Sequence, residues 1–350
     1  MTEILTNFIQ NCVGSHVFPG AVWAIGNSSR ILAKGNAGSL GIDLGSVKED
    51  SIYDMASITK IFAALAFMKQ LEDGLVRLED TVDYLLPAYK TSAFGEVTLF
   101  ALLTHTAPFP TATHLYRSVN TRDELLEKIR LYEFRKENTD RVLYTCEAFI
   151  LLGEIISAVD SAGLDKVIRS RVSEPLGMKN TCFTPPPELL PSIAPTEFCK
   201  IRGRIVRGEV HDENAMVMGG ISGNAGIFSC VPDMVLLGAA MLESLKRDSF
   251  LASAAAELMT RNHTAGKGEN RGLGWLLQGP NSPAGDLMSD SSFGHTGFTG
   301  TSIWIDPQND IYAVLLSNRV HPNRDNLEIK RARQIFHNLA VLEYGRKNNA

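Results

Sequence analysis

Two residues at the start of a predicted helix have the side chains and the spacing of a serine acylation site. Ser57 and Lys60 lie three positions apart, just ahead of an apolar, glycine-free run over residues 61–68 that predicts a buried helix. On a helix, a lysine three residues after a serine projects from the same face, within reach of the serine oxygen. Free backbone N–H groups and the dipole of the first turn favour negative charge there. If the lysine lies away from water, desolvation lowers its pKa, and it can accept the serine proton.

A tyrosine supplies a second candidate group. Tyr144 lies just ahead of the apolar residues 148–156, which predict another buried helix. A tyrosine at such a loop-to-helix junction can lean into a cleft, where its hydroxyl can relay protons beside Lys60. The alternative is a tyrosine whose ring packs in the core while its hydroxyl lies in water.

A glycine-rich segment, residues 294–300, supplies the third group and leads into an edge-like strand. Its glycines let a substrate backbone come close, and the strand offers N–H groups to an incoming chain or to an oxyanion. The alternative interpretation is the start of a hairpin with an incidental histidine, His295.

The three groups, in this order, resemble the three motifs of the serine beta-lactamase and penicillin-binding-protein superfamily. The matching positions are Ser57-x-x-Lys60, Tyr144-x-Cys146 and His295-Thr296-Gly297. The resemblance is strongest to the class C-like branch, which includes DD-peptidases, D-aminopeptidases and esterases. Further segments similar to that branch are residues 18–20, 102–106, 174–178, 210–215 and 219–229.

The resemblance implies a role for each matching residue. Ser57 would be the nucleophile, Lys60 its activating partner, and Tyr144 the proton shuttle between serine, leaving group and water. Either Lys60 or Tyr144 could take the first proton. The backbone N–H groups of Ser57 and Phe298 would hold the oxyanion, and losing one such donor typically costs about a hundred- to a thousandfold in rate. The substrate-binding positions would be Phe298, His295, Thr296, Gly297 and Cys146.

Two positions depart from the family pattern. The second motif usually ends in asparagine, whose amide holds the acyl-side amide of the substrate, but here it ends in Cys146, a weak hydrogen-bonder. The third motif often begins with lysine, a fixed cation for the substrate carboxylate. His295 is only partly charged near neutral pH unless its surroundings raise its pKa. Both changes argue against an efficient beta-lactamase and favour an ester or a small amide.

The elements that must position these residues predict an α+β fold. The expected strands are residues 21–26, 31–38, 274–277, 301–305 and 311–317. Helical patterns cover residues 3–13, much of 69 to about 200, and the C-terminal end from about 326. Strands at both ends of the chain with helices between them predict an antiparallel sheet.

The resemblance implies that this sheet is flanked by helices in the beta-lactamase/transpeptidase arrangement, with a helical lobe inserted. We expect residues 1–60 and 220–350 to form the sheet domain and residues 61–219 to form a mostly helical lobe. The active site is expected in the cleft between them.

Composition narrows the possible partners. The 350 residues are 44% hydrophobic and 21% charged, as in an ordinary globular protein with a substantial core. A net charge of −5 argues against nucleic acid or an anionic membrane as the main partner. The N-terminus lacks a secretion signal, and no stretch approaches the roughly 18 apolar residues that span a bilayer. Five scattered cysteines favour reduced thiols, and we expect a cytoplasmic protein with a small-molecule ester or amide substrate.

Other candidate sites are weaker. Residues 211–213 (His-Asp-Glu) could bind a metal, but no second cluster has matching spacing, so neither a metal nor an organic cofactor is expected. The glycine-rich residues 219–226 fit neither phosphate-binding spacing and favour a tight turn beneath the active site. Cys146 lacks a general base of its own, which makes it a weaker nucleophile than Ser57. His105 is expected to be a satisfied structural histidine.

We therefore expect a serine hydrolase that forms a covalent acyl-enzyme on Ser57. Carboxylic ester hydrolysis or acyl transfer is the first expectation. The alternative is a peptidase or amidase for D-amino-acid derivatives, similar to DD-carboxypeptidases, with weak or no beta-lactamase activity. An alternative of another class is a non-catalytic, ligand-binding relative. Substrate choice is expected to depend on residues 108–114 and 261–293.

Overall fold

The computed structural model describes residues 2–110, 114–133, 135, 141–280 and 282–345. Residues 111–113 and 281, which belong to the two segments expected to govern substrate choice, lie outside the described residues. Within the described ranges, none of the helices is both long and apolar enough to cross a bilayer.

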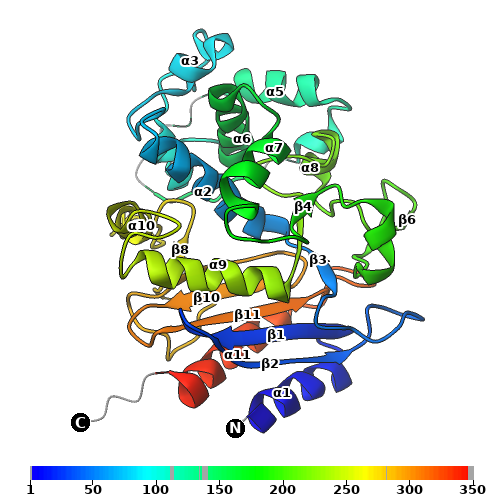
Figure 1. Cartoon of the computed structure of the whole chain (residues 1–350). Helices are drawn as coiled ribbons and strands as arrows, with labels where there is room; N and C mark the ends of the chain where they lie inside the picture. The colour runs from blue at the N-terminus through cyan, green and yellow to red at the C-terminus, as the bar shows by residue number, and fades with distance from the viewer. Residues whose placement is uncertain (1, 111–113, 134, 136–140, 281, 346–350) are drawn as a thin grey trace.

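A six-stranded antiparallel sheet, built from both ends of the chain, forms the base of the molecule (Figure 1). In spatial order its strands are β2 (Ile31–Gly38), β1 (Gly20–Gly26), β11 (Ile311–Ser317), β10 (Ser302–Asp306), β9 (Phe293–Thr296) and β8 (Leu276–Leu277). The N-terminal β1 pairs with the C-terminal β11 from Ala21 opposite Ser317 to Gly26 opposite Tyr312. The predicted antiparallel sheet from the two chain ends is confirmed, although β8 is shorter than the predicted strand at 274–277.

The central strand β1 is apolar on both faces because helices cover the sheet on both sides. Successive side chains of a strand point to opposite faces. Accordingly Trp23 packs with Phe336, their ring centroids 6.3 Å apart, whereas Val22 and Ala24 belong to the larger core on the other face. The helices α1 (Thr2–Gly14) and α11 (Ile329–Tyr344) lie on the first face, and α9 (Val231–Ser244) lies on the second (Figure 1).

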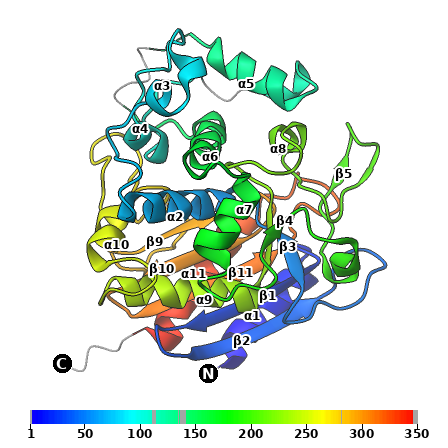
Figure 2. The ribbon, with the colours of Figure 1, turned by 45° about the horizontal axis from the view of Figure 1, so that its top comes forward.

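The helical region lies above the sheet in Figure 1 and is built around α2 (Thr59–Glu72). Residues 59–68 of α2 are all buried, as expected of a helix that is apolar all round. It packs against α6, and Figure 2 shows the two helices on the same side of the sheet. The other helices are α3 (Val82–Leu85), α4 (Leu99–Leu103), α5 (Arg122–Arg130), α6 (Glu147–Asp160), α7 (Leu164–Ile168), α8 (Glu213–Val217) and α10 (Ser253–Thr260).

Short strands join the helical region to the sheet. The three-stranded sheet contains β3 (Ile52–Asp54), β7 (Ile227–Cys230) and β4 (Cys182–Phe183), and a two-stranded sheet pairs β5 (Phe198–Cys199) with β6 (Arg204–Ile205). The predicted α+β fold with helices flanking an antiparallel sheet is confirmed.

A close backbone contact fixes the glycine-rich loop, residues 219–226, against α6. A Cβ atom on Gly223 would lie 2.1 Å from the carbonyl oxygen of Phe149. Because the obstacle is helix backbone, it cannot rotate away. We therefore expect Gly223→Ala to lower the free energy of unfolding by about 1–3 kcal/mol, the usual cost of overpacking. Urea denaturation measures this change.

Gly45→Ala is the matched control for this substitution, because a Cβ on Gly45 would meet no atom within 4 Å. We expect it to change stability by less than about 0.5 kcal/mol. Equal unfolding midpoints for the two variants would show that the loop is not held in this way.

Candidate active site

Ser57 lies in a 3-10 turn, Ala56–Ile58, between β3 and α2. The sequence predicted that the serine lies in the first turn of the helix, whereas α2 begins at Thr59, two residues after Ser57. Ala56 has a φ of +46°, a left-handed conformation that costs a non-glycine residue about 1–3 kcal/mol. Asp54 holds the turn, because its Oδ1 accepts from the Ala56 N–H at 2.7 Å and its Oδ2 from the His211 N–H at 2.6 Å.

Lys60 lies fully buried beneath Ser57 on α2. Its Nζ donates to Ser57 Oγ at 3.2 Å and to the carbonyl oxygen of Asn224 at 3.0 Å. Burial alone would lower the pKa of Lys60, but Tyr144, and Cys146 when it is ionised, act in the opposite direction, and the pKa is raised above its ordinary value. The predicted lowering of this pKa is therefore wrong. This direction favours the ammonium form, which donates to Ser57 Oγ.

The ring of Tyr144 lies beside Lys60. Lys60 Nζ lies 4.9 Å from the centre of its ring, and the guanidinium carbon of Arg271 lies 5.1 Å from it. The ring also contacts His105, with centroids 4.5 Å apart, and faces His295 at 6.0 Å. Residues 57, 60 and 144, which are distant in the sequence, are thus brought together with two cations around the phenol.

His295 lies on β9, opposite Ile303 of β10. The edge-like strand predicted here is an edge only in part, because β8 pairs with Phe293 and Gly294. From His295 onward, no strand in the described part of the chain pairs with that side of β9.

The imidazole of His295 is almost fully buried, and its Nδ1 is 2.9 Å from the carbonyl oxygen of Thr296. Burial, reinforced by Arg271 and Lys60, holds the pKa of His295 well below its ordinary value. His295 is therefore neutral near pH 7 and does not supply the fixed cation that lysine gives at this position.

The turn after β9 is tied to the segment that leads to Ser57. Thr299 Oγ1 donates to the carbonyl oxygen of Asp54 at 2.7 Å, and Thr301 Oγ1 donates to that of Met55 at 3.3 Å. Gly297 packs into this junction, and its N–H donates to the carbonyl oxygen of Thr301 at 2.7 Å. The backbone of the next residue, Phe298, is thereby held at a set position relative to the serine.

We expect Gly297→Ala to lower kcat for ester hydrolysis by about a hundredfold, because a displaced oxyanion donor costs that much or more. A Cβ at this position would lie 2.1 Å from Thr301 Oγ1 and 2.5 Å from the carbonyl oxygen of Met55. Gly14→Ala is the control, since its Cβ would meet nothing within 4 Å. Steady-state kinetics with p-nitrophenyl butyrate and a melting curve for each variant provide the measurement. Wild-type kcat in a folded Gly297→Ala protein would contradict this expectation.

A cavity of about 300 Å³ opens over Ser57. From the sequence-predicted site it is lined by Ser57, Tyr144, Cys146 and Phe298. The other predicted site residues do not line it: Lys60, His295, Thr296 and Gly297. His295 nevertheless contacts the ring of Tyr144. The cavity therefore joins the serine, the phenol and the segment after β9 in one space.

The family model described as Beta-lactamase matches residues 5–337 of this chain. The chain belongs to the beta-lactamase family. The match confirms the predicted resemblance to this family and supports a serine hydrolase.

Two kinds of relatives illustrate this family membership. A Salmonella gallinarum protein with the provisional name D-alanyl-D-alanine carboxypeptidase is 31% identical over 304 residues, covering 78% of this chain and 70% of its own. Among solved structures, the octameric penicillin-binding protein homologue from Pyrococcus abyssi has a TM-score of 0.76 at 22% identity, covering 97% and 77% of the two chains. EstCE1, a hydrolase with promiscuous acyltransferase activity, has a TM-score of 0.75 at 19% identity over 95% and 98%. At these identities the solved structures show the shared fold.

In this beta-lactamase-family member, Cys146 is a neutral thiol. Burial raises its pKa to about 12, even though Lys60 acts in the opposite direction. A thiol that keeps its proton is a poor nucleophile. The structure thus agrees with Ser57 as the stronger candidate.

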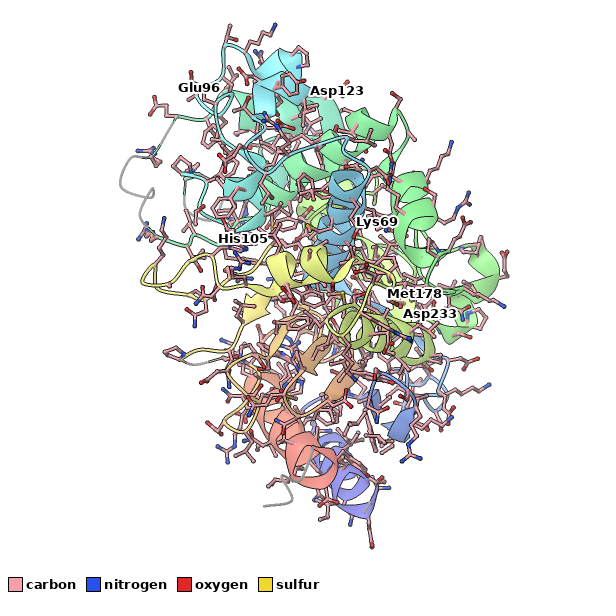
Figure 3. All side chains as sticks on the ribbon, turned by 60° about the vertical axis from the view of Figure 1, so that its left-hand side comes forward. Lys69, Glu96, His105, Asp123, Met178 and Asp233 are labelled. Carbon is pink, nitrogen blue, oxygen red and sulfur yellow. The ribbon has the colours of Figure 1, made fainter. Side chains whose placement is uncertain are left out.

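His105 differs from its predicted role. Its Nδ1 accepts from the Thr145 N–H at 3.4 Å, but its buried Nε2 has no hydrogen-bond partner among the described residues. Burial, with Arg271 and Lys60, holds its pKa well below the ordinary value. Figure 3 shows His105 where the helical region meets the segment that carries β8. The prediction of a fully satisfied histidine is wrong for one of its two nitrogens.

The sequence reasoning missed several cavity residues. They are Tyr116, Glu147 and Arg324, together with residues 211–214, which were considered only as a possible metal site and as part of a family-like segment; His114, from the predicted substrate-choice segment 108–114, also lines the cavity. His211 Nε2 is 2.7 Å from Glu197 Oε1, and Arg324 binds both Glu197 and Glu213. In the described part of the chain, no group of three or more His, Cys, Asp or Glu side chains is placed to hold a metal ion. A carboxyl directly after the second motif was the only sequence signal for Glu147.

Proposed function

We propose that this chain hydrolyses carboxylic esters, or transfers their acyl groups, through an acyl-enzyme on Ser57. The observation that carries the proposal is the hydrogen bond of 3.2 Å from Lys60 Nζ to Ser57 Oγ, beside the ring of Tyr144, in an open cavity. A serine hydroxyl whose proton passes to a neighbouring acceptor, here the oxygen of Tyr144, can attack a carbonyl carbon.

Tyr144, beside the Lys60 ammonium, is the proposed proton acceptor. It takes the Ser57 proton while Oγ bonds to the acyl carbon. The tetrahedral intermediate then expels the alcohol oxygen, which receives that proton from Tyr144. In the second half-reaction water gives its proton to Tyr144 and attacks the acyl carbon, and Ser57 Oγ leaves with the proton. Lys60 remains charged throughout, which its raised pKa supports.

The backbone N–H groups of Ser57 and Phe298 are the proposed oxyanion donors. Both residues line the cavity, and the bonds from Thr299 and Thr301 hold the two segments at a fixed distance. Donors held in advance stabilise charge that develops in the transition state without a reorganisation cost.

The neutral side chains at positions 146 and 295 favour esters over peptides. A thiol with a pKa of about 12 binds an amide weakly, and a neutral His295 gives no ion pair to a substrate carboxylate. The second candidate function is a D-alanyl peptidase, which the name of the Salmonella relative favours.

The two candidates are separated by comparing kcat/KM for p-nitrophenyl acetate and butyrate with kcat/KM for D-alanyl-D-alanine peptides. We expect the esters to be turned over faster. Faster release of D-alanine would favour the peptidase instead.

Restoring asparagine at position 146 is expected to raise the ratio of amide to ester turnover. One added neutral hydrogen bond is worth about 1 kcal/mol, or roughly fivefold in kcat/KM. The ratio is measured with an acylamino anilide and its matching ester, for wild type and Cys146→Asn. An unchanged ratio would mean that position 146 does not contact the acyl-side amide.

The proposal also places the site between a sheet domain, residues 1–60 and 220–350, and a helical lobe, residues 61–219. Cavity residues from both parts support this division, for example Phe298 and Tyr144. A cytoplasmic location is part of the same proposal, and the five unpaired cysteines are compatible with it.

A further inference from the structure

Two carboxyl groups that the mechanism does not use lie on the wall of the cavity above Ser57. Glu147 is the first residue of α6, and Asp212 caps the N-terminus of α8, where its Oδ1 accepts from the Ala215 N–H at 2.8 Å. The same Oδ1 accepts from Asn224 Nδ2 at 3.1 Å. The two carboxyls interact electrostatically with each other, with Cys146 and with Lys60.

Glu147 is the less satisfied of the two carboxyls. The residue is 1% exposed, and its Oε1 has no hydrogen-bond partner among the described residues. Burial raises the pKa of Glu147 to about 7, and the charge of Asp212 acts in the same direction. A buried acceptor without a donor is destabilising, and a ligand that supplies the donor would remove that cost.

The other charges along the cavity already have partners. Arg324 binds Glu213 at 2.7 Å and also binds Glu197, which contacts His211. Lys60 donates hydrogen bonds to Ser57 Oγ and to the carbonyl oxygen of Asn224 rather than to a carboxylate. Two carboxyls therefore face one buried ammonium, and in the described part of the chain the cavity is short of a positive charge.

We propose that Glu147 and Asp212 bind an ammonium group on the acyl part of the substrate, so that the preferred acyl donors are amino-acyl esters or amides with a free amino group. This inference rests on the proposed acyl-enzyme on Ser57. The neighbouring Cys146 stands where the family has the asparagine that holds an acylamino group, which places the two carboxyls on the acyl side. A weak hydrogen-bonder beside unpaired negative charge suits a free amine better than an acylated one.

Two matched pairs of p-nitrophenyl esters test the inference. D-Alanine is compared with isobutyrate, and β-alanine with butyrate, because in each pair a methyl group replaces the ammonium at nearly equal size. The quantity compared is the ratio of kcat/KM for the amino ester to kcat/KM for its amine-free partner. For the wild type we expect this ratio to be about 10 to 100 in at least one pair, as one charge-assisted hydrogen bond implies. Glu147→Gln and Asp212→Asn should each lower that ratio about tenfold.

The ratio is the readout because misfolding lowers turnover of both esters of a pair and leaves their ratio unchanged. Glu154→Gln is the matched control: this glutamate lies on the same helix, pairs with Arg122 and does not line the cavity. It should keep the wild-type ratio. A wild-type ratio near one in both pairs, or a ratio unchanged in both Glu147→Gln and Asp212→Asn, would overturn the inference.

The pH dependence gives an independent check with the β-alanine and butyrate pair. Glu147 binds the ammonium as a carboxylate. The kcat/KM ratio of β-alanyl ester to butyrate ester should therefore reach its maximum above pH 7 and fall as the pH drops through about 7, where Glu147 is protonated. The groups that face Glu147 are Asp212 ahead of α8, Lys60 on α2 and the backbone N–H groups of residues 146 and 147. A flat ratio from pH 5.5 to 8.5 would count against Glu147 as the ligand.

Failure of the proposed function has a different signature. If Ser57→Ala hydrolyses these esters as fast as the wild type, the acyl-enzyme on Ser57 is wrong. If the wild type hydrolyses none of them, inhibition constants for 1-aminoethylboronic acid and isopropylboronic acid replace the kinetic ratio. At least tenfold tighter binding of the amine, lost in Glu147→Gln, supports the inference, and equal binding of the two boronic acids overturns it.

Discussion

Ser57→Ala is expected to abolish ester turnover, with a loss in kcat of about 10⁴- to 10⁶-fold, as in other serine enzymes that lose their nucleophile. The substitution removes the atom proposed to form the acyl bond, while Lys60 keeps its bond to the carbonyl oxygen of Asn224. The fold should be unaffected, because Ser57 is only half-buried and alanine fits the same turn. Turnover of p-nitrophenyl butyrate and a urea melt are the two measurements.

The stability of Ser57→Ala is the control for this loss. We expect its free energy of unfolding to lie within about 0.5 kcal/mol of the wild type. A folded Ser57→Ala protein that keeps more than a tenth of wild-type kcat would remove Ser57 from the mechanism.

Lys60→Met has the second-largest expected effect. It removes the buried ammonium beside Ser57 and Tyr144 and keeps a side chain of similar length. We expect kcat to fall by about 10³-fold, within the range for loss of acid–base catalysis. Stability should stay equal or rise, because replacing a buried charge by an apolar group of similar volume is often neutral or stabilising.

Tyr144→Phe is expected to give a loss of similar size, and the double variant should be little worse than either single one. Residues that act as one proton-transfer unit give strongly non-additive effects. Lys69→Met, on the same helix but paired with Glu72, is the matched control and should keep wild-type kcat (Figure 3 labels Lys69). Losses that multiply in the double variant would show that Lys60 and Tyr144 act separately.

Much of the fold was predictable because its signals are local. The apolar run of β1 indicates a strand covered on both faces, and Trp23 and Val22 do pack on opposite faces of the sheet. The buried α2 follows from its apolar residues 61–68. The length of β8 was not predictable, because a strand ends where its pairing with β9 ends.

The candidate site was predictable only as far as three motifs could be placed in order. Spacing alone puts Lys60 near Ser57, but the approach of Tyr144 depends on how α6 packs against α2. The direction of the Lys60 pKa shift could not be predicted, because it depends on Tyr144 and Cys146, which come from another part of the chain.

The charge of His295 and the burial of Glu147 could not be predicted from the sequence. A histidine in a glycine-rich segment gives no sign that Arg271 and burial will keep it neutral, as happens to His295. Likewise, a glutamate at a helix start is ordinarily solvated, and only the packed structure reveals that Glu147 lies buried in the cavity wall. These properties arise from contacts between distant segments.

The most direct test of the central claim is the intact mass of the protein after exposure to p-nitrophenyl butyrate and a rapid acid quench, followed by peptide mapping. The account predicts one butyryl group per chain, carried on the peptide that contains Ser57, and no such group on Ser57→Ala. Acylation of a different peptide, for example the one with Cys146, or an equal mass increase in Ser57→Ala, would contradict it.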